Sequence, residues 1–246
     1  GLQSHNRALG CQIEASTPKR FPFISFDGRR IIMADLQQVA QSLIKGQASE
    51  VEEGVQQALD EGVPVREILH EGLIAGMNVV GAKFKNNEFY IPEVLIAARA
   101  MKAGMQLIRP QLIEEKVEPA GIAAIGTVKG DLHDIGKNLV AMMLEGAGFQ
   151  IVDLGIDVPP ERFLESVREQ GVQIVCMSAL LTTTMPSMKA TVEAIKEAGI
   201  TDDVRTMVGG APVTQAYADQ IGADAYAADA ASAADQAREL IDQLSN

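Results

Sequence analysis

Residues 121–136 read GIAAIGTVKGDLHDIG, a short apolar run followed directly by a loop of glycine, aspartate and histidine. The run 121–128 has the length and the β-branched content of a buried strand. Residues 137–146, beyond the loop, carry apolar side chains at helical spacing. A buried strand, a polar loop and a helix in this order predict the first half of a βαβ unit.

The same alternation of strand and helix continues to residue 244. Strand-like runs lie at residues 150–154, 173–177, 205–208 and 223–227. Helical patterns lie at residues 160–170, 186–198 and 230–244. This order predicts a doubly wound, five-stranded parallel sheet of the Rossmann or flavodoxin-like type, with right-handed crossovers. Ligands of such sheets bind beyond the carboxyl ends of the strands, so the loops after strands one, three and four form the candidate site.

The preceding residues 33–115 contain helical patterns only. Their apolar stripes are short, and short helices bury such stripes by packing together, which predicts a small bundle. The charged stretch 114–119, EEKVEP, indicates a linker. We therefore expect an α/β protein with a helical domain at 33–115 and a sheet domain at 120–246. Residues 1–32 lack sustained periodicity, and we interpret them as an extension, disordered or added for expression, to which we assign no function.

Composition limits the classes of function. The 246 residues carry a formal net charge of −12, which argues against a general nucleic-acid binder because phosphate neutralisation needs a basic face. We find no apolar run long enough to span a membrane and no secretory signal. The two cysteines, Cys11 and Cys176, fit a reducing compartment. These features predict a cytoplasmic protein that binds neither membranes nor nucleic acid.

The loop after the first strand contains a histidine with a carboxylate two residues before it. Gly130, Gly136 and Lys137 do not form a phosphate loop, because the glycine spacing is wrong and Asn138 stands where Ser or Thr is required. A metal-bound imidazole usually donates its second N–H to a carboxylate, which fixes the tautomer. His133 is therefore a candidate metal ligand with Asp131 as its partner. Alternatively, Asp131 is a turn residue or helix cap and His133 a solvated loop residue.

The loops after the third and fourth strands also contain polar or flexible groups. Ser178 and the run 182–184 supply four hydroxyls before a proline-initiated helix, and helix capping alone is the alternative explanation. Gly209 and Gly210 allow a backbone to approach a bulky ligand closely, or form a tight turn.

The combined pattern, D-x-H-x-x-G at 131–136, S-x-L at 178–180 and G-G at 209–210, resembles the B12-binding module of cobalamin-dependent methyltransferases and mutases. The resemblance implies a base-off/His-on corrinoid, in which His133 replaces the cofactor's own base as the lower axial ligand of cobalt. It implies that Asp131 accepts a hydrogen bond from His133, and that Thr184 continues the relay where methionine synthases have Ser. It further assigns cofactor contacts to Gly136, Ser178, Leu180, Thr182, Gly209 and Gly210.

Residues 72–94 are similar to the cap bundle that precedes this module in methyl-transferring corrinoid proteins. The resemblance implies that Phe84, Ile91 and Val94 shield the methyl group on the upper cobalt face, as in methionine synthase. A place in the bundle core is the alternative for Ile91 and Val94, whereas Phe84 lies in a polar stretch and is harder to explain as core. We interpret His70, within an apolar helical stripe, as structural or surface.

The resemblance as a whole implies a free-standing methyl carrier that is not catalytic alone. It accepts a methyl group on Co(I) from a methoxylated aromatic compound, methanol or a methylamine, with O-demethylation preferred. A second methyltransferase then passes the methyl group to tetrahydrofolate or a thiol. The implied partners are a substrate-specific methyltransferase, a corrinoid-to-acceptor methyltransferase and a reductive activator.

Two other classes are considered. A B12-dependent photosensory regulator also combines a helical cap with a B12 module, but it needs a DNA-binding domain in front and typically a cap tryptophan, and this sequence has no tryptophan. A corrinoid-free flavodoxin-like or receiver-like domain is the other alternative. Receiver domains need clustered acidic residues at strand ends, which are not evident here.

Overall fold

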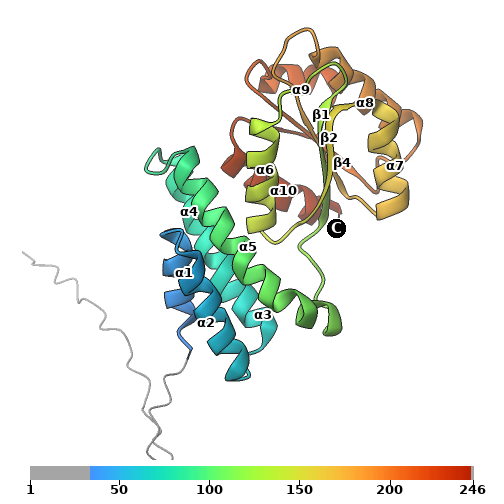
Figure 1. Cartoon of the computed structure of the whole chain (residues 1–246). Coiled ribbons are helices and arrows are strands. Elements are labelled where there is room, and N and C mark those ends of the chain that lie inside the picture. Colours follow the sequence, from blue (N-terminus) through green and yellow to red (C-terminus); the bar gives the residue numbers. More distant parts are fainter. Residues whose placement is uncertain (1–33, 245–246) are drawn as a thin grey trace, which may run out of the picture. The chain divides into compact units, whose positions relative to one another are not determined.

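The structure, a computed structural model, describes residues 34–244, so the predicted extension 1–32 lies outside the described residues (Figure 1). The N-terminal half is a bundle of helices, as the sequence predicts. Asp35 begins the first helix by accepting hydrogen bonds from the backbone N–H groups of Gln37 and Gln38. The bundle consists of α1 (Leu36–Ile44), α2 (Ala48–Asp60), α3 (Val65–Glu67), the π-helical segment η1 (Ile68–Ile74), α4 (Ala75–Lys85) and α5 (Ile91–Glu114).

The C-terminal half is built on five parallel strands in the order β2-β1-β3-β4-β5, which confirms the predicted sheet. The strands are β1 (Ile122–Val128), β2 (Gln150–Val158), β3 (Ile174–Ser178), β4 (Arg205–Gly209) and β5 (Ala225–Ala227). The helices are α6 (Ile135–Gly146), α7 (Pro160–Gln170), α8 (Met185–Glu197), α9 (Gln215–Ile221) and α10 (Ala230–Leu244). The short helix α9 was not predicted from the sequence.

Helices cover both faces of the sheet. Ala123 and Ile125 of β1 belong to the apolar core beneath α6 and α10, whereas Ala124 and Val128 belong to the core beneath α7 and α8 (Figure 1). This alternation follows from the two-residue period of a strand. Helix α6 follows β1 on one face and α8 follows the neighbouring β3 on the other. The connections that follow β1 and β3 therefore leave the sheet toward opposite faces. Doubly wound sheets of this strand order bind ligands at this point, beyond the carboxyl ends of the two strands.

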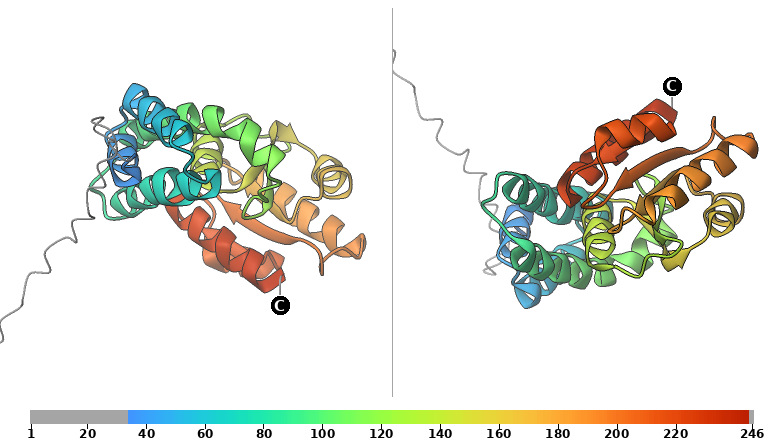
Figure 2. Two further views of the ribbon diagram at one scale, coloured as in Figure 1. Left: turned by 90° about the horizontal axis from the view of Figure 1, so that it is seen from below. Right: turned by 90° about the horizontal axis from the view of Figure 1, so that it is seen from above.

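The helical bundle packs against α6 and α10 through small side chains (Figure 2). A Cβ atom added at Gly146 would lie 2.7 Å from Cε of Met77, so the glycine lets α4 approach α6 closely. Lys85 forms an ion pair of 2.7 Å with Asp235 of α10. Within residues 34–244, no helix has the length and hydropathy to cross a bilayer. The cytoplasmic location stays a prediction.

Candidate cofactor site

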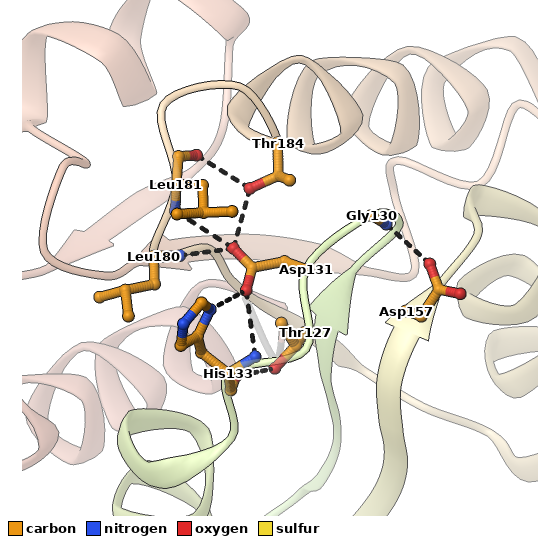
Figure 3. Close-up of polar contacts among 8 residues, drawn as sticks. All are labelled: Thr127, Gly130, Asp131, His133, Asp157, Leu180, Leu181 and Thr184. Carbon is orange, nitrogen blue, oxygen red and sulfur yellow. Dashed lines mark hydrogen bonds and ion pairs between the residues drawn. The ribbon is translucent and has the colours of Figure 1, made fainter.

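The carboxylate of Asp131 is the centre of the candidate site and has no exposed surface (Figure 3). Its Oδ1 accepts hydrogen bonds from Nδ1 of His133 at 2.7 Å and from the His133 backbone N–H at 3.1 Å. Its Oδ2 accepts the backbone N–H groups of Leu180 and Leu181 at 2.8 and 3.2 Å, and the Thr184 hydroxyl at 2.8 Å. Asp131 thus ties the loop after β1 to the loop after β3.

These donors keep Asp131 ionised. Burial by itself would raise the pKa of the Asp131 carboxyl, but the hydrogen bonds from His133, from Leu180 and from Thr184 outweigh burial and hold the pKa well below its usual range. The Thr184 hydroxyl also lies 2.8 Å from the Leu181 carbonyl. Because a hydroxyl has one hydrogen, it donates to one acceptor at a time, and the charged carboxylate is the stronger of the two.

His133 presents its imidazole to the outside of the sheet edge, with its side chain 52% exposed. When Nδ1–H of a neutral imidazole donates its hydrogen bond to Asp131, Nε2 carries the lone pair that a metal ligand needs. The His133 main chain is fixed as well, because the buried Thr127 hydroxyl donates to the His133 carbonyl at 2.8 Å. An oriented, half-exposed imidazole backed by a buried carboxylate is suited to bind one metal ion from one side.

Strand β2 holds the beginning of the loop through contacts that the sequence did not reveal. Oδ1 of Asp157 accepts the Gly130 N–H at 2.7 Å, and the Asp157 N–H donates to the Asp131 carbonyl at 3.0 Å. Asp157 has a φ of 54°, in the left-handed region. The predicted second strand ended at residue 154, so Asp157 was not among the candidate residues. Thr127 was not among them either, because it lies within the first predicted strand.

Large apolar side chains are exposed at this sheet edge. A group of large hydrophobic side chains at the carboxyl ends of β1, β2 and β3 is exposed: Leu132, Ile135, Ile156, Leu180 and Leu181. A Cβ atom added at Gly136 would meet nothing within 4 Å, so no packing within the described protein explains the glycine there. An exposed histidine among apolar side chains, with free space over Gly136, fits the flat and largely apolar ring of a corrinoid.

The remaining predicted residues of the sheet domain lie at the same edge. Ser178 is half-buried at the end of β3 and Thr182 is exposed in the following turn. Gly210 has a φ of 126°, and an added Cβ would lie 2.0 Å from the Ala179 carbonyl oxygen. At Gly209 it would lie 2.9 Å from the carbonyl oxygen of Ala227. The backbone itself therefore requires both glycines, and their contact with a cofactor stays a prediction.

The cap residues differ in their surroundings. Phe84 is half-buried against the bundle core, and Ile91 is 43% exposed at the start of α5. Val94 is completely buried in the bundle core, so in this structure it has no surface to offer a cofactor. The alternative position expected for Val94 from its helical spacing was the bundle core, and Val94 lies there. His70 is exposed on η1.

Fold and site together define a class of protein: an α/β protein whose candidate cofactor site lies at the switch point of its parallel sheet. Two family models match the chain, both described as a B12 binding domain, over residues 121–237 and 35–109. The chain belongs to the family of B12-binding corrinoid proteins. The predicted resemblance and the cobalamin or related corrinoid cofactor are therefore confirmed.

Individual relatives agree with this membership. The chain is 43% identical to dimethylamine corrinoid protein 3 of Methanosarcina acetivorans, over 85% of this chain and 100% of the relative. It is 50% identical to the trimethylamine corrinoid protein of Methanosarcina barkeri, over 71% and 82% respectively. The solved methanol:cobalamin methyltransferase complex of Methanosarcina barkeri superposes with a TM-score of 0.75 at 30% identity, covering 84% of this chain and 79% of that chain.

Proposed function

We propose that this protein is the methyl carrier of a corrinoid-dependent methyltransferase system, with a methylamine as its methyl donor. The observation that carries the carrier role is the buried Asp131 carboxylate bonded to Nδ1 of the half-exposed His133. The donor is inferred from relatives whose names specify dimethylamine and trimethylamine. Methoxylated aromatic donors, preferred from the sequence, stay a prediction, and no relative described above supports the photosensory alternative.

In the proposed base-off/His-on arrangement, His133 would hold the cobalt through Nε2. A bound corrinoid supplies a cobalt centre that takes up a methyl group and releases it to a nucleophile. The protein's part is to orient His133 through Asp131 and to keep the Nδ1 proton in place. Exposed apolar side chains of the sheet edge, such as Leu132 and Ile135, would exclude water from a bound corrinoid.

The partners are proposed on the same basis. One solved structure with a chain that superposes on this protein is the methanol:cobalamin methyltransferase complex of Methanosarcina barkeri, which supports a donor-specific methyltransferase as the first partner. Exposed apolar side chains on the cap, Tyr90, Ile91 and Leu95, offer contact area for such a partner. A second methyltransferase for tetrahydrofolate or a thiol, and a reductive activator, complete the proposed system.

The test is a methyl-uptake assay on the full chain loaded with cobalamin and reduced. Trimethylamine, dimethylamine, methanol and a methoxylated aromatic compound are each supplied with a methyltransferase encoded beside this protein, and the visible spectrum reports methylation. Uptake from a methylamine supports the proposal. Uptake from methanol or the aromatic compound alone shows the proposed donor to be wrong, and no uptake from any donor contradicts the carrier role.

A further inference from the structure

Lys137, in the first turn of α6, is a buried cation next to the candidate site. Its side chain is 3% exposed, and Nζ lies 2.5 and 2.7 Å from the two carboxylate oxygens of Asp153 on β2. The Asp153 side chain is 48% exposed, so the pair joins the interior of α6 to the surface of the strand.

Asp153 lies at an irregularity of β2. Its neighbour in β1 is Ile125, but the next β1 residue, Gly126, pairs with Gly155, so that Leu154 is an extra residue in the strand. Oδ1 of Asp153 accepts the Gly155 N–H at 2.9 Å, and Gly155 has a φ of 83°. Asp153 therefore fixes the bulge that sends the end of β2 toward the site.

Beyond this bulge, β2 reaches the loop that carries the histidine. Asp157 holds Gly130 and Asp131 at the beginning of the loop. Lys137 follows the end of the same loop by a few residues and returns to β2 through Asp153. Strand β2 therefore contacts the chain both at the beginning of the loop and in the first turn of α6. His133 lies between these two points of attachment.

The energetics of the pair favour a role in position over a role in stability. Removing a Lys from water costs free energy that attraction to a carboxylate only partly offsets, and an apolar side chain of similar volume is often equally stabilising. An ion pair of fixed geometry does, however, define where two elements sit relative to each other. A methionine would fill the same space but would not fix the position of α6 relative to β2.

We propose that Lys137 and Asp153 form a positioning pair that sets the direction in which His133 presents Nε2 to the cobalt. This inference rests on the proposed His-on function. Lys137 acts through α6 and β2 and touches neither the metal nor the reacting groups. Replacing it is expected to leave the fold intact and to weaken ligation by His133.

The experiment compares the full chain with Lys137→Met, Asp153→Asn and Lys137→Arg. Lys189→Met is the matched control, because Lys189 forms an exposed 3.6 Å pair with Glu193 on α8. Each protein is labelled with ¹⁵N, loaded with unlabelled cobalamin and reduced to the Co(II) state. Electron paramagnetic resonance then distinguishes a protein nitrogen, which splits each line into a doublet, from the cofactor's own ¹⁴N base, which gives a triplet.

We expect Lys137→Met and Asp153→Asn to lower the ratio of protein-ligated to unligated cobalt by roughly 10-fold. Effects of this size are typical when residues that orient a metal ligand are replaced. The control should match the wild type, and Lys137→Arg should restore part of the doublet because its guanidinium can bind both oxygens. The apo Lys137→Met variant should unfold within a few degrees of the wild type. Asp153→Asn leaves the buried Lys137 ammonium without its carboxylate and should unfold at a lower temperature.

Three results would overturn the inference. An undiminished doublet in both variants shows that the pair does not position His133. Loss of the apo fold in both variants shows that the pair is structural. A wild-type protein without the doublet refutes His-on ligation itself, and with it the inference, which distinguishes failure of the proposed function from failure of the pair.

Discussion

Oδ1 of Asp131 lies 2.7 Å from Nδ1 of His133, and the two side chains differ fully in exposure: the carboxylate is buried and the imidazole is 52% exposed. The buried partner fixes the exposed one, because the same carboxylate is held by two backbone N–H groups and a hydroxyl from the loop after β3. The position of the imidazole is therefore determined by contacts within the protein itself.

Asp131→Asn tests this dependence. A carboxylate accepts from all five donors around it, whereas an amide turns its own N–H groups toward some of them. We expect the apo protein to lose about 1–3 kcal/mol of unfolding free energy and corrinoid affinity to fall roughly 10- to 100-fold. Urea unfolding and cobalamin titration measure both effects. Asp134→Asn, at an exposed neighbour, is the control, and equal behaviour of the two variants would argue against the prediction.

The lowered pKa of Asp131 predicts how stability depends on pH. A carboxylate whose pKa is lower in the folded than in the unfolded chain stabilises the fold above the unfolded value of about 3.9 and loses that contribution as pH falls through the folded value. Between pH 6 and 8 the wild type and Asp131→Asn should therefore differ by a constant unfolding free energy. Below about pH 4 the difference should shrink. A difference independent of pH down to pH 3 would refute the assignment.

Two substitutions at Thr184 distinguish the stabilising contribution of its hydroxyl from that of its side-chain volume. Thr184→Val keeps the shape and removes a donor to the buried carboxylate, which should cost about 1.5–3 kcal/mol. Thr184→Ser keeps the donor and removes one buried methyl group, which should cost about 1 kcal/mol. Urea denaturation of the apo proteins gives both values. If Thr184→Ser is the more destabilising of the two substitutions, Thr184 stabilises the fold through packing and not through its hydrogen bond.

Gly136 and Gly210 should respond in opposite ways to alanine. At Gly136 a Cβ meets open space, so Gly136→Ala should stabilise the apo protein by up to about 1 kcal/mol through helix propensity. The same methyl group would occupy the proposed place of the corrinoid and should weaken its binding roughly 10-fold or more, about 1.4 kcal/mol. Thermal unfolding and cobalamin titration test the pair of effects, and unchanged cofactor affinity would contradict the assignment of this surface.

Gly210→Ala should instead disrupt the apo fold. The added methyl group would lie 2.0 Å from a backbone oxygen at a φ of 126°, a strained backbone position, and we expect a cost of about 3 kcal/mol or more. Unfolding of the cofactor-free protein measures it. A stable apo variant would show that the loop relaxes, and would leave the cofactor as the reason for the glycine.

The sheet was predictable because each strand is a short apolar run between turn residues, and the D-x-H-x-x-G pattern located the loop. The end of β2 was missed because Gly155 and Asp157 interrupt its apolar pattern, although backbone pairing continues through two register shifts to Val158. Helix α9, of seven residues, is too short to show a clear period.

Within the site, the pairing of Asp131 with His133 and Thr184 was expected from the family pattern. The backbone donors at Leu180 and Leu181 were not, because any residue has an N–H group and only the fold decides where it points. Thr127 was hidden in the first strand as one more β-branched residue. The helical spacing of Val94 agreed with the bundle core, where the residue lies, whereas its contact with the cofactor was inferred from the family resemblance alone.

The central claim is that His133 binds the cobalt, and ¹⁵N-labelled protein with unlabelled cobalamin tests it most directly. His133→Ala is compared with the wild type and with His70→Ala, a variant of the exposed histidine on η1. We predict a ¹⁵N doublet in the Co(II) spectrum of the wild type and of His70→Ala, and its complete loss in His133→Ala. A doublet that persists without His133, or that is absent from the wild type, would contradict the account.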